Sequence, residues 1–334
     1  MTASAVSLPS CRQLASLLAA LVCSLPVHAA DSPRAWLERM AAAVDGLNYS
    51  GKLVHVYGGE STVLSVVQRV EGGKATERLT AGDGSREIIR TADEVTCILT
   101  DQRTVLVEQR DPQAPGASPI RGHLPGPAGI DATLYHVALG ERDRIAGRDA
   151  LGIVIRPKDG FRYGYRLWLD RASAMPLKTQ LVDEQGTVLE QVLFTEISLP
   201  QHLPREAVQP SIAVSTFAVR RAPATGSEPA GEPANAWTAG EVPPGFRLTV
   251  RQARAADGPG SGLWHSVYSD GLATVSLFVE PAVAAAEQAE GLSQIGAANA
   301  YTAIVDGHMV TAIGSVPART VEVLAQSARP TGAR

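Results

Sequence analysis

The stretch FRYGYRLWLD, from Phe161 to Asp170, predicts a β-strand with two unlike faces. Side chains alternate between the two sides of a strand, so residues two positions apart share a face. The odd positions are all apolar or aromatic: Phe161, Tyr163, Tyr165, Leu167 and Leu169. We therefore expect this set to point into an interior, and we expect Gly164 to let the sheet bend.

The other face of this stretch carries Arg162, Arg166 and Trp168. Two interpretations of the arginines remain open. In the first, they pair with acids on neighbouring strands of an outer, convex face. In the second, they contact a phosphate or an acidic partner, to which the planar guanidinium is suited.

Many more short strands are predicted on both sides of the stretch. The first series runs from Lys52 to Gln109, and turn sequences such as Gly58-Gly59 separate its segments. Turns this short join antiparallel hairpins. A Pro- and Gly-rich interval and a short apolar or helical piece at 132–138 follow, and strands resume from Leu151 to Ile197. A meander of this length must curve, because strands twist.

A helix precedes the first strand. Asp31 or Ser32 can cap it, and Pro33 suits its first turn. Trp36 and Met40 lie on one apolar stripe with helical spacing, so the helix needs a sheet to lie on. The predicted fold is therefore mostly β, of the α+β class. It has an N-terminal curved antiparallel half-barrel sheet with helices on its concave side, and a small C-terminal antiparallel α+β domain.

Composition divides the chain into four parts. Residues 1–29 combine Arg12, an apolar run and a small-residue ending, which predicts a cleaved signal peptide and export. Residues 30–200 form the half-barrel domain, and the Pro- and Ala-rich residues 201–236 predict a linker. Residues 237–328 form the C-terminal domain, which has a weak helix or a mobile excursion at 281–298.

Charge and cysteine content narrow the classes of partner. The formal net charge of −4 gives no indication of a nucleic-acid partner. Cleavage after Ala29 would leave Cys97 as the single cysteine, so no internal disulfide is expected. We predict that Cys97 is a buried strand residue, with a redox role or a disulfide-linked dimer as the alternative.

The sequence contains no recognisable catalytic motif. It lacks zinc-protease spacing, a Gly-x-Ser-x-Gly elbow and a P-loop. Its histidines are scattered, and His55 and His265 both fall on predicted strands. We therefore predict no catalytic residue, no metal site and no cofactor. A binding protein is the simplest class for an exported chain of two domains.

Several motifs, in one order along both predicted domains, resemble the MucB/RseB proteins, periplasmic regulators of the extracytoplasmic stress sigma factor in Gram-negative bacteria. They are NYSG (48–51), ERL (77–79), VTC (95–97), RIAGR (144–148), RYGYRLWLD (162–170), LEQ (189–191), PGF (244–246), YSDGL (268–272) and VDGH (305–308).

This resemblance implies a half-barrel like those of the lipoprotein carriers LolA and LolB. It also implies a second domain that helps to clamp the periplasmic part of a transmembrane anti-sigma factor of the RseA/MucA type. Bound there, the protein would block the first cleavage of the anti-sigma factor. Lipopolysaccharide or lipoprotein acyl chains would displace it from the anti-sigma factor. Whether the protein also forms a homo-oligomer is left open. The alternatives are a lipid or lipoprotein carrier and, from the exported context alone, a cell-wall hydrolase.

Candidate site residues follow from this interpretation. We expect the partner surface to include Trp264, Tyr268, Asp270 and Phe278, because exposed aromatics are favoured anchors. For Trp264 and Phe278, an ordinary core position is the alternative. The candidate lining of a lipid cavity is Trp36, Met40, Phe161, Tyr163, Tyr165 and Leu167. The candidate anion contacts are Arg162 and Arg166.

Overall fold

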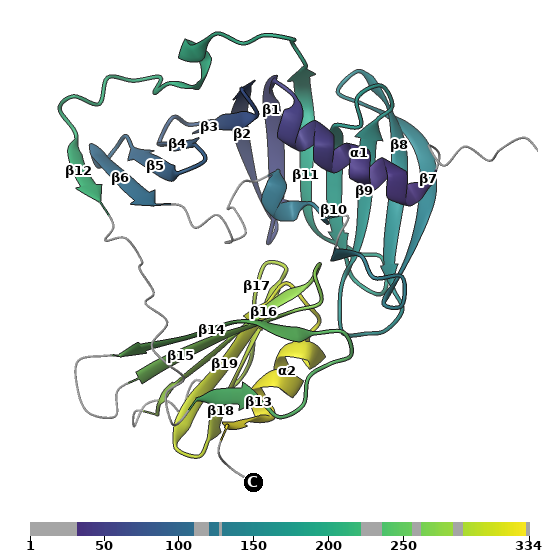
Figure 1. Ribbon diagram of the computed structural model, residues 1–334, viewed down its shortest axis with the longest axis vertical. Helices are drawn as coiled ribbons and strands as arrows, with labels where there is room; N and C mark the ends of the chain where they lie inside the picture. Colours follow the sequence, from purple (N-terminus) through teal and green to yellow (C-terminus); the bar gives the residue numbers. More distant parts are fainter. Residues whose placement is uncertain are drawn as a thin grey trace, which may run out of the picture.

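The computed structural model describes residues 32–109, 120–126, 129–221, 236–255, 262–282 and 290–331. The predicted signal peptide lies outside these residues. A large sheet and a smaller sheet make up most of the described chain (Figure 1). Among the described residues, no helix combines the length and the apolarity needed to cross a membrane.

The large sheet has twelve strands in the order β12, β6, β5, β4, β3, β2, β1, β11, β10, β9, β8, β7. Two antiparallel meanders meet where β1 pairs with β11. The strands are β1 (Tyr49–Tyr57), β2 (Glu60–Glu71), β3 (Lys74–Ala81), β4 (Arg86–Arg90), β5 (Glu94–Leu99), β6 (Thr104–Gln109), β7 (Tyr135–Ile145), β8 (Arg148–Pro157), β9 (Gly164–Asp170), β10 (Pro176–Val182), β11 (Val188–Ser198) and β12 (Ala218–Arg221).

Helix α1 (Pro33–Gly46) lies against one face of this sheet, which we call the inner face (Figure 1). Ser32 caps the helix, since its hydroxyl accepts a hydrogen bond from the amide of Ala35 at 3.1 Å. Trp36 and Met40 are buried against strands β8 and β9. The apolar stripe of the helix and the inner face of the sheet thus share one core, as the sequence predicts.

Only part of the FRYGYRLWLD stretch is a strand. Strand β9 begins at Gly164, and Leu167 pairs with Ile153 on β8 and with Thr179 on β10. Tyr165, Leu167 and Leu169 contribute to the core beneath α1. Phe161 to Tyr163 lie before the strand, so the expectation of one continuous face from Phe161 to Leu169 is wrong.

A strap of chain crosses the outer face of the sheet, opposite α1, over strands β2 to β6. It includes the short helix η4 (Arg205–Val208) and ends in β12, which pairs in parallel with β6. Three apolar strap residues pack on the buried cluster of Ile98, Val105 and Val107: Ile212, Val214 and Phe217. Residues 205–221 therefore belong to the large sheet, although the sequence assigns them to a linker.

The smaller sheet has six strands in the order β14, β15, β16, β19, β18, β17. They are β14 (Arg247–Ala255), β15 (Gly262–Ser269), β16 (Thr274–Pro281), β17 (Gly291–Ile295), β18 (Ala298–Val305) and β19 (His308–Gly314). Helix α2 (Ala318–Gln326) packs Val321 and Leu324 on one face. Strands β13 (Trp237–Ala239) and β20 (Ala328–Pro330) form a separate pair.

The predicted fold class is confirmed: the chain is mostly β, with an open curved sheet carrying a helix and a separate smaller α+β sheet. Two segments for which the sequence left a helix open are not helical where the structure describes them. The piece at 132–138 enters strand β7, because its alternating residues Tyr135 and Val137 face the core. The weak helix predicted at 281–298 is contradicted where the structure describes that segment, since residues 291–295 form strand β17.

Candidate functional site: the junction of the two sheets

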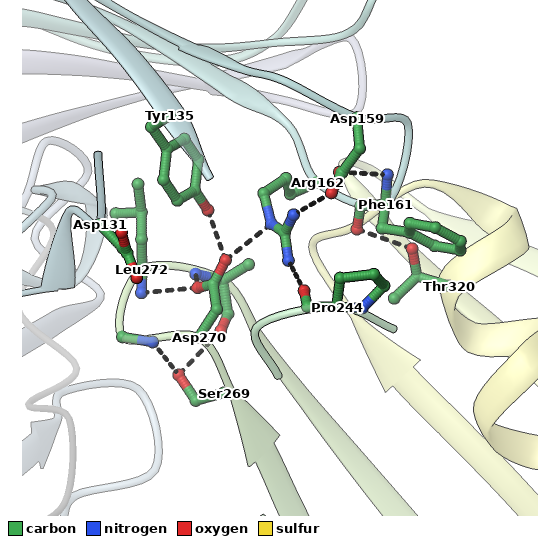
Figure 2. Close-up of polar contacts among 12 residues, drawn as sticks. Asp131, Tyr135, Asp159, Phe161, Arg162, Pro244, Ser269, Asp270, Leu272 and Thr320 are labelled. Carbon is green, nitrogen blue, oxygen red and sulfur yellow. Dashed lines mark hydrogen bonds and ion pairs between the residues drawn. The ribbon is translucent and has the colours of Figure 1, made fainter. Parts of the chain in front are cut away.

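A fully buried arginine joins the two domains. Arg162 lies in the turn before β9, and its exposed fraction is 0%. Its Nε donates to the carboxylate of Asp270 at 2.7 Å, and one Nη donates to the carbonyl of Pro244 at 2.5 Å (Figure 2). The other Nη pairs with Asp159 of its own turn. Three acceptors from both domains therefore surround one guanidinium.

Asp270 is the matching group on the second domain. It lies in the turn between β15 and β16, and its side chain is 0% exposed. One carboxylate oxygen accepts from the amides of Leu272 and Ala273 at 2.8 and 2.7 Å. The other accepts from Arg162 and from the hydroxyl of Tyr135 at 2.7 Å (Figure 2). The carboxylate is thus bonded on both sides, which suits a buried charge.

Tyr135 remains a hydrogen-bond donor at this site. Burial, followed by the neighbouring negative charge of Asp270, raises the pKa of the Tyr135 phenol well above its ordinary value. The guanidinium of Arg162 also lies over two rings, at 5.0 Å from the Phe246 ring centre and 5.6 Å from that of Tyr135. Cation–π contacts of this kind add to the charge pairing.

Two glycines let the backbones of the domains touch. Gly271 follows Asp270 and has a positive φ of 97°. A Cβ added there would lie 2.8 Å from the Cα of Gly129, and a Cβ on Gly129 would overlap the Gly271 carbonyl. Neither position has room for a side chain.

A second set of contacts lies on the other side of the junction. Asn299 donates to the Tyr163 hydroxyl at 3.0 Å, and the Tyr57 hydroxyl donates to the carbonyl of Ile295 at 2.5 Å. Thr320 of α2 donates to the carbonyl of Phe161 at 2.7 Å (Figure 2). The Phe161 ring packs against the core of the smaller sheet. The junction is therefore bonded at several separate points.

A cavity of about 430 Å³ adjoins the junction. Its lining mixes apolar and polar side chains from the inner face with backbone of the Asp270 turn: Arg121, Gly122, Leu124, Tyr165, Thr179, Leu181, Glu190, Gln191, Val192, Gly271, Leu272, Ala273, Thr274 and Ser315. Glu190 is 7% exposed and lies 2.6 Å from Nε2 of His55. Both domains thus contribute to one partly apolar space.

The residues predicted to line a lipid cavity separate into three places. Trp36, Met40 and Leu167 are buried in the core beneath α1, and Tyr165 lies between that core and the cavity. Tyr163 packs beside Leu181 and Ala297, and Phe161 packs on the smaller sheet. The interpretation that Arg162 lies on the convex face is wrong, because the turn before β9 directs its side chain into the junction. The neighbours of Arg166 across the sheet are Val154 and Gln180, so the interpretation that Arg166 pairs with acids on adjacent strands is also wrong.

The four residues predicted for a partner surface also differ in position. Asp270 is buried in the junction, and Tyr268 is 2% exposed with its hydroxyl accepting from the amide of Ala239 at 2.7 Å. Trp264 packs against the core of the smaller sheet. Phe278 lies on the opposite face, stacked on His265 at 4.4 Å with an interplanar angle of 7°. Among these four, Phe278 alone is turned away from both core and junction.

The sequence does not indicate the remaining junction residues. Tyr135 falls in the segment predicted as apolar or helical, and Pro244 contributes only its carbonyl. The YSDGL motif does contain a signal, since an aspartate followed by glycine predicts a turn. Nothing in that motif reveals that the turn meets an arginine 108 residues away. Among the described residues, no group of three or more His, Cys, Asp or Glu side chains is placed to hold a metal ion.

Acidification should weaken the smaller sheet through His265. Burial lowers the pKa of this imidazole, so the folded state binds its proton less readily than the unfolded chain. Stability contributed by neutral His265 is then lost as pH falls below about 6.5, the ordinary histidine value. Denaturant unfolding should show that the free energy of unfolding falls less between pH 7.5 and pH 5 for His265→Gln than for the wild type. The exposed His136→Gln variant is the control, and an equal loss in all three proteins would contradict this role.

Comparisons with known protein families match both parts of the chain. The model of the MucB/RseB N-terminal domain matches residues 32–212, and that of the MucB/RseB C-terminal domain matches residues 231–329. The sigma factor AlgU regulatory protein MucB of Pseudomonas aeruginosa is 32% identical over 326 residues, which cover 95% of this chain and 96% of MucB. The sigma-E factor regulatory protein RseB of Haemophilus influenzae is 27% identical over 304 residues, which cover 88% of this chain and 90% of RseB.

Solved structures agree with this match. The complex structure of Pseudomonas aeruginosa MucA/MucB has a TM-score of 0.69 at 29% identity, covering 90% of this chain and 99% of the other. A crystal structure of MucB in complex with MucA(peri) has a TM-score of 0.67 at 28% identity, covering 90% and 100%. A structure described only as MucB has a TM-score of 0.58 at 28% identity, covering 89% and 97%. The TM-score is thus higher for the two structures of MucB with MucA than for the structure described only as MucB.

Proposed function

Because this chain belongs to the MucB/RseB family, we propose that it is a periplasmic regulator that binds the periplasmic domain of a transmembrane anti-sigma factor. By covering that domain, it shields the anti-sigma factor from site-1 proteolysis and so restrains the envelope-stress sigma factor. The observation that carries this proposal is the similarity to MucB in complex with MucA, which extends over both domains. Its relatives are described as regulatory proteins, which supports binding rather than catalysis as its role.

A retention experiment tests this function. The periplasmic domain of the host's own anti-sigma factor is immobilised, and the purified protein is passed over it at micromolar concentration. We expect stoichiometric retention and slower cleavage of the anti-sigma domain by the site-1 protease. Absence of retention would refute the proposal.

The junction is the part of the molecule proposed to control this binding. A partner that contacts both domains binds most tightly when the contact surfaces of both domains face it at once. Its binding therefore favours that arrangement of the domains over others. The greater similarity to MucA-bound MucB supports the idea that the arrangement described here is the binding-competent one. The chain's own buried ion pair between Arg162 and Asp270 would then stabilise that arrangement.

Phe278 is the residue we propose as an anchor for the partner. It is partly exposed on the face of the smaller sheet opposite α2, where its ring stacks on His265. Aromatic residues in such positions carry a large share of binding energy at interfaces. Phe278→Ala should weaken retention of the anti-sigma domain about tenfold. Val219→Ala, at a residue that is 55% exposed on the large sheet, is the control. Equal retention by both variants would exclude Phe278 from the interface.

Release by lipid is proposed to act through the cavity at the junction. Its walls include Leu124, Leu181 and Val192 from one domain and Leu272 from the other. An acyl chain that entered between them would favour separation of the domains and loss of the partner. Titration of the complex with lipopolysaccharide and with a lipopeptide should release the anti-sigma domain. If labelled acyl chains instead pass to acceptor membranes while the partner stays bound, the alternative role of lipid or lipoprotein carrier gains support.

A further inference from the structure

A short segment packs on the inner face of the large sheet beside α1. It comprises the described residues 120–126 and 129–130, including the short helix η2 (Arg121–His123), and we call it the lid segment. Ile120 is 4% exposed and packs in the buried cluster that contains Val44 of α1 and Leu79 of β3. Leu124 packs against that cluster and against the core beneath α1. Apolar side chains thus hold the lid segment on the inner face.

Arg121 fastens the lid segment to the end of α1. One Nη donates to the carbonyl of Val44 at 2.9 Å and to Oε1 of Gln68 at 3.1 Å. The other Nη pairs with the carboxylate of Asp45. Val44 and Asp45 both belong to the last turn of α1, so one guanidinium binds a carbonyl and a carboxylate at the same helix end. The planar fork of arginine donors suits several acceptors at once, whereas a lysine ammonium acts as a single point charge.

The C-terminal end of α1 receives its positive charge from the lid segment. The last four carbonyls of a helix have no partner within the helix, and they give its end a partial negative charge. The last turn of α1 contains no basic residue. Arg121, which lies 77 residues after Val44, supplies the cation. Nε2 of Gln68 completes the helix end, since it donates to the carbonyls of Val44 and Leu47 at 2.8 and 3.0 Å.

A buried network fixes Gln68 and, through it, the position of Arg121. Gln68 is 0% exposed, and its Oε1 lies 3.4 Å from the hydroxyl of Tyr49. The same hydroxyl lies 3.2 Å from the carboxylate of Glu77, which accepts a hydrogen bond from Arg90 at 2.8 Å. Burial, followed by the charge of Glu77, raises the pKa of the Tyr49 phenol well above its ordinary value, so Tyr49 remains a donor. The amide that receives Arg121 therefore belongs to the buried interior of the first domain.

The lid segment also reaches the cavity and the second domain. Arg121, Gly122 and Leu124 line the cavity at the junction. Gly129 lies against Gly271 of the Asp270 turn, so closely that a Cβ on Gly129 would overlap the Gly271 carbonyl. One short segment therefore contacts the end of α1, forms part of the cavity wall and touches the turn that carries the buried carboxylate of the junction.

We propose that the lid segment is a releasable lid of the cavity and that Arg121 is the positioning residue that keeps it shut. With Arg121 bound to the end of α1, Leu124 closes one side of the cavity and Gly129 supports the Asp270 turn. Once Arg121 leaves the helix end, the cavity opens and the turn loses a neighbour, so the two domains separate more readily. This inference rests on the proposed function in one respect, that the joined arrangement is the one that binds the anti-sigma domain. The coupling itself is a property of the free protein.

Hydrogen exchange of the intact protein, without any partner, tests this coupling. Arg121→Gln removes the positive charge at the end of α1, and Arg121→Lys keeps it. Arg69→Gln is the matched control, because Arg69 is another partly buried arginine that pairs with a carboxylate and donates to a backbone carbonyl, that of Leu203, at 3.0 Å. Mass spectrometry follows exchange in the lid segment and at the amides of Leu272 and Ala273. The fluorescence of the neutral apolar dye N-phenylnaphthylamine reports access to the cavity.

We expect Arg121→Gln to raise exchange at least about tenfold at both places and to increase dye binding, because local opening becomes more frequent. Arg121→Lys should give a smaller rise at both places, and it carries the test if Arg121→Gln does not fold. Arg69→Gln should change neither place. Faster exchange in the lid segment alone would overturn the proposal, and so would equal behaviour of the Arg121 and Arg69 variants. Exchange is measured without the anti-sigma domain, so this result stands whether or not the retention experiment supports the proposed function.

Discussion

Replacing Asp270 by alanine should separate the two domains and destabilise the protein by about 3–5 kcal/mol, the usual cost of leaving a buried charge without its partner. In the wild type, Asp270 accepts hydrogen bonds from Arg162 and from Tyr135, and both members of the ion pair are 0% exposed. Without the carboxylate, Arg162 keeps only Asp159 and the Pro244 carbonyl. The guanidinium gains access to water most simply if the junction opens.

Small-angle scattering and denaturant unfolding together check this result. The radius of gyration should increase, and unfolding should divide into two transitions, because coupled domains lose cooperativity when their interface is removed. Arg162→Met/Asp270→Ala should recover part of the lost stability, since no buried charge remains. Asp159→Ala is the milder control, as Asp159 is partly exposed and belongs to the same turn as Arg162. A compact, single-transition Asp270→Ala protein would show that the ion pair does not hold the junction.

Replacing Gly271 by valine should open the junction while both sheets stay folded. Valine strongly disfavours the positive φ of 97° at this position, and its Cβ would lie 2.8 Å from the Cα of Gly129. Backbone strain of this kind costs of order 1–3 kcal/mol, and the steric clash adds to it. The Asp270 turn would have to withdraw from the first domain to relieve both. Binding of the anti-sigma domain should then fall at least tenfold, because the bound arrangement is less populated.

The control separates strain within a turn from contact between the domains. Gly147 also has a positive φ, of 75°, but no atom lies within 4 Å of a Cβ placed on it. Gly147→Val should therefore destabilise the first domain without changing the distance between the two. Amide hydrogen exchange around Tyr135 should rise in the Gly271 variant and not in the Gly147 variant. If exchange and partner binding change equally in both, the close approach at Gly271 has no special role.

Local patterns in the sequence predict the elements of this fold better than the places where the elements meet. Alternation identifies Tyr165, Leu167 and Leu169 as one face, and that face does pack beneath α1. The same alternation extended to Phe161 and Arg162 fails, because it contains no information on where the strand begins. Glycines such as Gly164 suit a strand and a turn equally well, so the boundary depends on tertiary contacts.

The junction could not be predicted for a related reason. A buried ion pair between residues far apart in sequence has no periodic signature, and each member taken alone looks like an ordinary surface charge. Neither interpretation offered for Arg162, an ion pair on the convex face or contact with a phosphate or an acidic partner, places it against Asp270 of the same chain. The strap was missed because proline and small residues predict a linker, although three apolar residues there, Ile212, Val214 and Phe217, contact the sheet. Isolated apolar residues in an irregular segment carry no period to detect.

The strap also determines what happens to the second domain after the junction separates. Since β12 is paired to β6 at the far edge of the large sheet, the chain that continues to the second domain starts from a fixed point. A tethered pair of surfaces meets again as an intramolecular event, at an effective concentration in the range of about 1 mM for a short connection. Opening is then readily reversible, and the restoring tendency is the same at any protein concentration. We therefore expect the two domains to close again without help from a second molecule.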